Sequence, residues 1–221
     1  MPSLVLASSS PRRAALLSES GFEFDVAPPP VAEKFDAALT LRELTHWNAI
    51  RKGMSMAQTR PDAVVLAADT LVALKNEIIG KPADLDQATD VLQRLSGRTH
   101  EVCSAVLIYH QTSGRLVVFH EVSRVRFHRL NRAMIKKYFA KVDPLDKAGA
   151  YAIQYAGFQP VDLEQFAGCF ANVMGLPVCR LLRLFSARGV PPALAQAPGD
   201  CEQFQAGACP IVPQIVMESA R

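Results

Sequence analysis

The sequence lacks several features that would assign it to a compartment or a metal-binding class directly. Its five cysteines include no Cys-x-x-Cys pair, which disfavours both a structural zinc site and a disulfide framework. No apolar run reaches the roughly 18 residues that a membrane span requires. The N-terminal apolar run, Leu4–Ala7, is too short and uncharged for a signal peptide. We therefore expect a cytoplasmic protein with no membrane partner.

The common nucleotide-binding and nucleophile motifs are also missing. There is no Walker A sequence and no Gly-x-Gly-x-x-Gly fingerprint, which disfavours P-loop and Rossmann sites. None of the five histidines accompanies a serine or cysteine elbow, so we expect them to be structural. The net charge of +3 over 221 residues is too small to indicate a nucleic-acid polymer as partner. A negatively charged ligand would need a local cluster of cations.

What the chain does contain is a series of short apolar and amphipathic segments. Apolar runs predict strands at Leu4–Ala7 and Ala63–Ala68, the second ending at Asp69. Alternating patterns predict a hairpin of Val102–Tyr109 and Leu116–Phe127. Periodicity, N-cap residues and prolines predict helices at 11–21, 40–57, 84–95, 134–141 and 177–187. Weaker patterns predict a strand at 22–26 and two strands within 71–79, joined by a turn at Lys75-Asn76.

The second of these helices has an unusual composition. Its predicted apolar face carries Leu41, Leu44, Trp47 and either Ala49 or Ile50. It also contains Gly53, and glycine inside a helix costs about 1 kcal/mol relative to alanine. We therefore expect the helix to end early.

Two arginines stand where a helix disfavours them. Arg12 and Arg13 directly follow the Ser10-Pro11 helix start, where the macrodipole opposes a cation by roughly 0.3–1 kcal/mol each at exposed sites. A tight strand-to-helix connection also leaves free backbone N–H groups, which attract anions. This placement predicts that a negative group binds at the start of the helix.

Further charges lie near the ends of predicted elements. Each has an ordinary explanation as a solvated side chain or a cap, but together they suit a triphosphate. Cations would hold phosphates, while carboxylates would hold a metal and orient water. These residues are Glu33, Lys52, Asp69, Lys81 and Lys147.

Six short motifs, in order, resemble those of the Maf family of nucleoside triphosphate pyrophosphatases. Each motif is weak alone, and the series over about residues 3–189 is specific. The motifs are Ser-Ser-Ser-Pro-Arg-Arg at 8–13, Ala-Ala-Asp-Thr at 67–70, Gly-Lys-Pro at 80–82, Leu-Ser-Gly with His100 at 95–100, Asp-Lys-Ala-Gly-Ala-Tyr-Ala-Ile-Gln at 146–154, and Asn-Val-Met-Gly-Leu-Pro at 172–177.

The resemblance implies an α/β fold with a mixed twisted sheet flanked by helices. Two lobes would surround a central cleft, similar to inosine triphosphate pyrophosphatases. The implied reaction is hydrolysis between the α- and β-phosphates, with Mg²⁺ or Mn²⁺ as cofactor, in house-cleaning nucleotide metabolism. Family members are cytoplasmic and often form homodimers. The family-like domain would cover residues 1–189, and residues 190–221, rich in Ala, Pro and Gln, would be an appended tail.

The resemblance also implies roles for individual residues. Asp69 would be the catalytic carboxylate, acting with Lys52 and Glu33, and either as a base or by positioning a metal-activated water. Asp69 and Glu33 would be the metal ligands. The substrate-binding set would be Ser8, Arg12, Arg13, Lys81 and Gln154, of which Gln154 reads the base.

The implied substrate depends on the branch of the family. The run at 147–154 resembles the branch that acts on dTTP, UTP and modified pyrimidine nucleotides, which we favour. One alternative is hydrolysis of 7-methyl-GTP. Another is a nucleotide-binding regulator without turnover, linked to cell division. The presence of Asp69, Lys52 and Lys81 together argues against the regulator.

Overall fold

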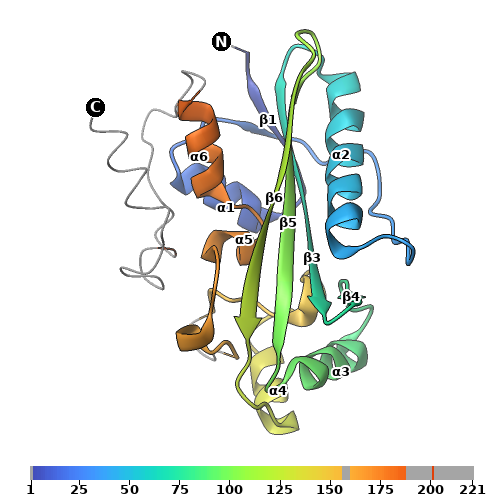
Figure 1. Cartoon of the computed structure of the whole chain (residues 1–221), viewed down its shortest axis with the longest axis vertical. Helices are drawn as coiled ribbons and strands as arrows, with labels where there is room; N and C mark the ends of the chain where they lie inside the picture. Colours follow the sequence, from blue (N-terminus) through green and yellow to red (C-terminus); the bar gives the residue numbers. More distant parts are fainter. Residues whose placement is uncertain (1, 156–159, 188–200, 202–221) are drawn as a thin grey trace.

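The computed structural model describes residues 2–155, 160–187 and 201. Within them, one six-stranded mixed sheet has the order β2-β1-β3-β5-β6, and β4 pairs with β3 outside this path (Figure 1). Pairing with β1 is parallel, whereas β3, β4, β5 and β6 pair antiparallel. The strands are β1 (Leu4–Ala7), β2 (Asp25–Val26), β3 (Val64–Leu74), β4 (Glu77–Ile79), β5 (Thr99–His110) and β6 (Arg115–Arg126).

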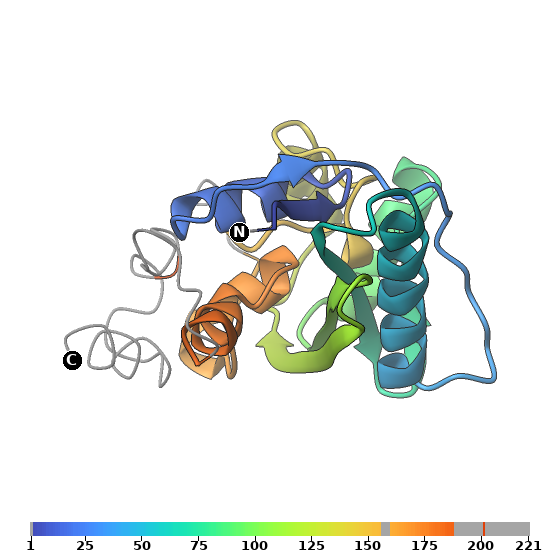
Figure 2. The ribbon, with the colours of Figure 1, turned by 90° about the horizontal axis from the view of Figure 1, so that it is seen from above.

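Helices cover both faces of this sheet, which confirms the predicted mixed α/β architecture. Helix α2 lies along one face, and α1, α5 and α6 lie on the other (Figures 1 and 2). The helices are α1 (Pro11–Glu19), α2 (Leu41–Thr59), α3 (Leu85–Leu95), α4 (Arg132–Phe139), α5 (Phe170–Met174) and α6 (Val178–Ser186), with short 3₁₀ turns η1 (Ala148–Ala150) and η2 (Leu163–Gln165).

The period-two alternation of strand side chains explains the two layers. In β1, Val5 and Ala7 belong to a small core with Met56 of α2, whereas Leu6 belongs to the larger core with Leu16 of α1. The apolar strand runs are therefore buried on both sides, as expected for the parallel part of the sheet.

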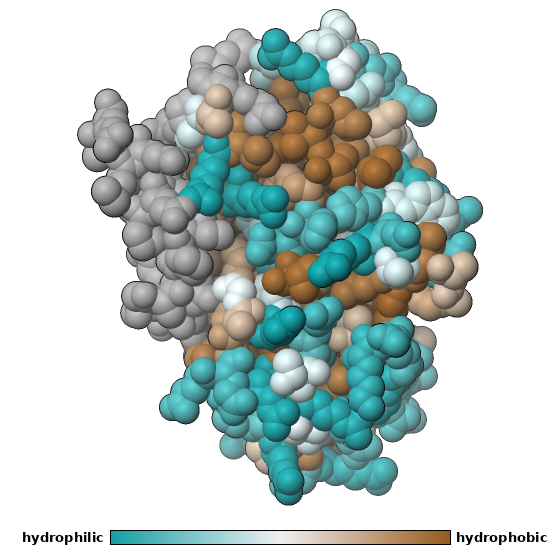
Figure 3. Space-filling view, viewed as in Figure 1, coloured by the Kyte–Doolittle hydropathy of each residue, from teal (hydrophilic) through white to brown (hydrophobic). Residues whose placement is uncertain are grey.

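Helices α3 and α4 are amphipathic. Their buried side chains, such as Leu92 and Ile135, join the larger core. The end of the molecule that they form is mostly hydrophilic on the side shown in Figure 3. Among the described residues, no helix is both long and apolar enough to cross a bilayer.

The predicted end of β3 at Asp69 is wrong. The strand continues to Leu74, and Asp69 lies in mid-strand opposite Ala105 of β5. No glycine or proline stands among residues 70–74, so the strand continues past Asp69. On the other edge, β1 pairs with β3 as far as Ala67, and β4 pairs from Val72. Residues 68–71 therefore have no neighbouring strand on that edge, and this break is where the site forms.

The expected early end of α2 is also wrong. The helix runs to Thr59, and Gly53 is buried inside it. A Cβ at Gly53 would lie 2.2 Å from Leu107 Cδ2 and 3.2 Å from Ala67 Cβ, so glycine allows α2 to approach the sheet. The buried face of α2 includes polar side chains, and of the predicted apolar residues it contains Leu44 and Ala49.

Two further expectations differ in extent. The strand predicted at 22–26 is reduced to Asp25–Val26. The tail predicted at 190–221 lies outside the described residues apart from Cys201, which is buried in the larger core. The boundary at residue 189 stays a prediction.

His100 is buried and structural, as expected from the sequence. Its Nε2 lies 2.9 Å from the Tyr151 hydroxyl, and its ring packs edge-on against Phe127. Burial lowers the pKa of His100 from 6.5 to about 3. The folded protein therefore resists protonation of this ring.

This burial predicts a pH dependence of stability. Between pH 6.5 and about 3 the unfolded chain binds a proton at His100 that the folded chain does not, so acid favours unfolding. The free energy of unfolding should fall by up to about 1.4 kcal/mol per pH unit from this group as pH decreases. Urea unfolding of wild type and His100→Gln between pH 7.5 and 4.5 tests this, and equal slopes for both proteins would contradict it.

Candidate active site

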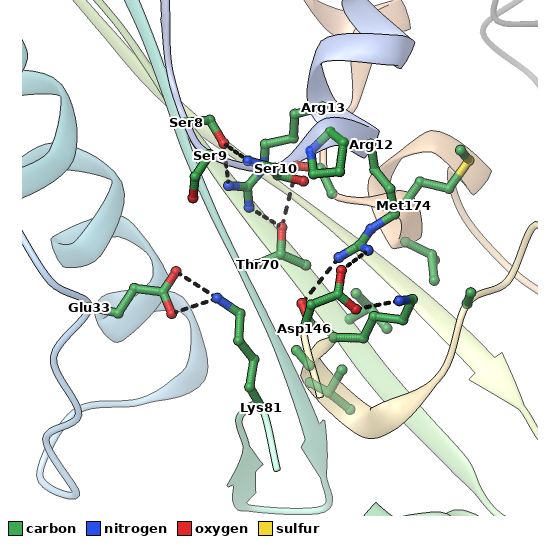
Figure 4. Close-up of a pocket in the computed structure, with 18 of the residues that line it drawn as sticks. Ser8, Ser9, Ser10, Arg12, Arg13, Glu33, Thr70, Lys81, Asp146 and Met174 are labelled. Atoms are coloured by element: carbon green, nitrogen blue, oxygen red, sulfur yellow. Dashed lines mark hydrogen bonds and ion pairs between the residues drawn. The ribbon is translucent and has the colours of Figure 1, made fainter. Parts of the chain in front are cut away.

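A pocket of about 440 Å³ opens at the break in the edge of β3 (Figure 4). Its walls come from the β1–α1 turn, the loop before α2, the loop after β4 and the segments around 146–154 and 173–175. Seven of the eight predicted site residues line it: Ser8, Arg12, Arg13, Glu33, Lys52, Lys81 and Gln154. The eighth, Asp69, is buried directly behind Lys52. The structure thus brings together residues from four of the six quoted motifs, with Glu33 and Lys52 from outside them.

Arg13 is held by neutral oxygens. Its Nε donates to the Gly175 carbonyl (2.9 Å), Nη1 to Ser8 Oγ (3.3 Å) and Nη2 to Thr70 Oγ1 (3.0 Å). No carboxylate among the described residues forms an ion pair with it, and burial lowers the pKa of Arg13. A partly buried cation in neutral surroundings favours an anionic ligand.

The Gly175 carbonyl reaches Arg13 because of the way α5 ends. Gly175 is the left-handed C-cap of α5, with φ of +118°, a conformation that side chains other than hydrogen disfavour. A carbonyl at a helix end attracts cations. The Arg13 side chain therefore extends from the start of α1 to the C-terminal end of α5.

Arg12 takes a different partner. Its Nη1 lies 2.7 Å from Asp146 Oδ2, and Lys147 contacts the other oxygen of the same carboxylate. Partial burial opposes ionisation, but Lys147 and Arg12 together lower the pKa of Asp146. Asp146 was not predicted as a site residue, although it begins the motif at 146–154.

Lys52 bridges the two predicted acids. Its Nζ lies 2.6 Å from Asp69 Oδ1 and 2.7 Å from Glu33 Oε1. The Lys52 and Asp69 side chains are only 7% and 2% exposed, whereas that of Glu33 is 42% exposed. Lys81 Nζ meets the other oxygen of Glu33 at 3.2 Å. The two acids therefore differ in environment: Asp69 is buried, and Glu33 is partly exposed at the mouth of the pocket.

That difference sets their proton affinities in opposite directions. Burial raises the pKa of Asp69 despite the attraction of Lys52. Partial burial would raise the pKa of Glu33 as well, but Lys52 and then Lys81 lower it to about 2. Asp69 is the better proton acceptor of the pair, and Glu33 is a permanent anion at neutral pH.

Asn48 explains how Glu33 reaches the site from an irregular loop. The Asn48 side chain accepts from Lys34 N and donates to Lys34 O, both at 3.0 Å. Asn48 lies one helical turn before Lys52 on α2. Its two hydrogen bonds to the Lys34 backbone therefore hold Glu33, the residue before Lys34, next to Lys52. Neither Asn48 nor Thr70 was predicted as a site residue, and the spacing of Asn48 from Lys52 was the available signal.

The oxygen atoms present fit a metal that substrate helps to hold. Asp69 Oδ2 is buried and has no hydrogen-bond partner among the described residues. Those residues contain no group of three or more His, Cys, Asp or Glu side chains that could hold a metal alone. Mg²⁺ is commonly bound by one or two carboxylates plus substrate phosphates and waters. Asp69 and Glu33 satisfy the protein's share of that arrangement.

Gln154 lies at the apolar part of the pocket. Ala152 and Ile153 line the same wall, and Gln154 Oε1 is buried without a partner among the described residues. An unpaired carbonyl oxygen beside apolar side chains suits a flat ligand that carries an N–H donor.

Known proteins resemble this chain over most of its length. The sequence model of the family described as Maf-like protein matches residues 3–188. The chain is 41% identical to a protein named dTTP/UTP pyrophosphatase from Aquifex aeolicus, over 82% of this chain and 93% of that one. It is 39% identical to one of the same name from Pelotomaculum thermopropionicum, over 86% and 98% of the two chains. A solved HAM1 protein from Coxiella burnetii aligns over the whole of both chains at 15% identity, with a TM-score of 0.48.

Proposed function

Since this chain belongs to the Maf family, we propose that it is a nucleoside triphosphate pyrophosphatase acting on dTTP and UTP. It would release the nucleoside monophosphate and pyrophosphate. The observation that supports this most is the convergence of Arg12, Arg13 and Lys81 on a pocket backed by the Lys52-bridged acids. The predicted cytoplasmic location and homodimer remain predictions.

The proposed chemistry follows from charge. Attack of water on a phosphate adds negative charge to a group that already carries several. Arg13, whose partners are neutral, would bind phosphate oxygens with its planar fork, and Lys81 would neutralise charge at the mouth. Asp69, with its raised pKa, would accept the proton of the attacking water, and Lys52 would hold the Asp69 carboxylate in position.

A divalent cation, Mg²⁺ or Mn²⁺, is part of this proposal. Asp69 and Glu33 would hold it together with the substrate phosphates. When bound, it would withdraw charge from the phosphate oxygens and lower the pKa of bound water. Before substrate arrives, Lys52 and Lys81 neutralise the same carboxylates.

The pyrimidine preference is assigned to Gln154. Its unpaired Oε1 would accept the N3–H donor that uracil and thymine share. Cytosine has no proton at this position, so CTP and dCTP would leave the oxygen unsatisfied. The methyl group of thymine would face the apolar wall.

A substrate panel tests the proposal. Purified protein with Mg²⁺ is offered dTTP, UTP, dCTP, CTP, GTP, ATP and 7-methyl-GTP, and pyrophosphate and orthophosphate are measured separately. We expect the highest kcat/KM for dTTP and UTP, with pyrophosphate as product and no turnover in excess chelator. Preference for 7-methyl-GTP, or binding without any product, would overturn the proposed function.

A further inference from the structure

A chain of two hydroxyls, the half-buried Thr70 and the buried Ser104, leads from Arg13 away from the pocket. Arg13 Nη2 donates to Thr70 Oγ1 at 3.0 Å, which lies 2.8 Å from Ser104 Oγ. Ser104 Oγ in turn donates to the Asn172 carbonyl at 2.9 Å. Thr70 and Ser104 are direct partners in the β3–β5 register. Ser104 has no exposed surface and does not line the pocket.

The proton positions in this chain follow from counting donors. The Asn172 carbonyl only accepts, so it takes the single proton of Ser104. Ser104 must then accept from Thr70, which leaves the Thr70 oxygen to accept from Arg13. If Thr70 donated instead to the Gly175 carbonyl, 3.4 Å away, two hydroxyl oxygens would face each other at 2.8 Å without a proton. In the reverse orientation Ser104 would donate to Thr70, and Thr70 to the Gly175 carbonyl, while the Asn172 carbonyl would keep only its bond from Gly175 N–H at 3.0 Å. That orientation replaces the 2.9 Å bond from Ser104 with one of 3.4 Å, so the distances favour the first orientation.

The far end of the chain is firmly anchored. Asn172 is fully buried, and its Nδ2 donates to the Val102 carbonyl (3.0 Å) and to Ser123 Oγ (2.9 Å). The carbonyl of Gly175, three residues later, accepts directly from Arg13. The segment at 172–175 thus supports Arg13 twice, once directly and once through two hydroxyls.

We propose that Ser104 is a positioning residue, which orients the Thr70 hydroxyl and through it the Arg13 guanidinium. The effect on catalysis rests on the proposed function, since it requires Arg13 to bind substrate phosphates. Without Ser104, Thr70 keeps its hydroxyl but can turn its proton toward Gly175, and the Arg13 fork loses a fixed acceptor. The substrate would then meet an arginine that is present but less well oriented.

The kinetic test is a double-mutant cycle with a matched control. Ser104→Ala is made in wild type and in Arg13→Lys, and kcat/KM for dTTP is measured. We expect a loss of roughly tenfold or more in wild type, because the Thr70 hydroxyl that accepts from Arg13 is no longer held in one orientation, and less than about twofold in Arg13→Lys. Ser20→Ala is the control, since Ser20 is equally buried and donates to a backbone carbonyl, that of Leu16, but does not line the pocket or belong to this chain of bonds.

A second readout does not depend on turnover. In protein labelled with [¹⁵N]arginine, the Arg13 Nε–H resonance is identified by its loss in Arg13→Lys. Its exchange with water should be faster in Ser104→Ala and unchanged in Ser20→Ala. If Ser104→Ala fails to fold, Thr70→Val removes the middle hydroxyl at similar volume and takes the same measurements.

The outcomes separate the two proposals. Equal kinetic losses in both backgrounds, equal losses in the two serine variants, or an Arg13 resonance insensitive to Ser104 would overturn the positioning role. If wild type hydrolyses no nucleotide, the proposed function fails, and the exchange measurement still decides whether Ser104 orients Arg13.

Discussion

Asp69→Asn is expected to lower kcat for dTTP by about 10²–10⁴-fold while the protein stays folded, since a general base contributes on this scale. The amide keeps the shape of the carboxylate and can still accept from Lys52, but it cannot take a proton from water. Asp69 is the acid whose pKa burial raises, and Glu33, at about 2, is too weak a base to replace it. Pyrophosphate release, with thermal unfolding as the folding check, measures the effect.

Asp162→Asn is a suitable control for this change. Asp162 caps η2, asparagine caps equally well, and the residue does not line the pocket. Its kcat should stay within about twofold of wild type, since exposed substitutions of this kind have small effects. A kcat for Asp69→Asn within threefold of wild type would refute any direct part for Asp69 in the reaction, whether as base or as metal ligand.

Lys52→Met should affect both turnover and stability. The change leaves Asp69 buried without its cation and next to Glu33, and breaking a buried ion pair from one side costs about 3–5 kcal/mol. Glu33 is partly exposed, so the lower end applies. Turnover should be lost as well, because Asp69 would be neutralised or displaced.

The pH dependence of this variant has a definite sign. Without Lys52, the folded-state pKa of Asp69 rises further above its value of 3.8 in the unfolded chain. Protonation then favours the folded state, so the stability deficit relative to wild type should shrink as pH falls from 8 toward 5. Urea unfolding at both pH values measures it.

A double variant separates charge from catalysis. Lys52→Met with Asp69→Asn removes both charges and should recover much of the lost stability, because a buried neutral amide costs far less to desolvate than a buried unpaired carboxylate. Activity should stay absent. If Lys52→Met alone unfolds no more easily than wild type at pH 8, the bridge to Asp69 is not an energetically coupled pair.

Local rules predicted most of the element boundaries. The Ser10-Pro11 signal, the Asp84 cap and the glycine of the β5–β6 turn all act through neighbouring backbone, so sequence alone reveals them. Gly53 led to the wrong prediction that α2 ends early, because its role lies in packing against a distant strand and not in helix propensity. Its absent side chain makes room for Leu107, which is 54 residues away. Helix propensity cannot report a contact of that kind.

The same distinction applies to the site. The anomaly of two arginines at a helix start was visible in the sequence, and it pointed to the right place. Asp146 and Thr70 were not found, because nothing local shows that Arg12 and Arg13 reach across to them. The mid-strand position of Asp69 was missed because an acid after an apolar run resembles a strand end, and only the pairing with β5 shows that β3 continues.

The break in the edge of β3 has a consequence for how such an enzyme can change its substrate. Asp69 is fixed within an uninterrupted strand, while the connection that leaves β1 leads to Arg12 in the first turn of α1 and the connection that leaves β4 carries Lys81. Insertions or substitutions in those connections would reshape what enters without moving the acid. A library confined to the two connections should therefore yield altered nucleotide selectivity far more often than loss of folding.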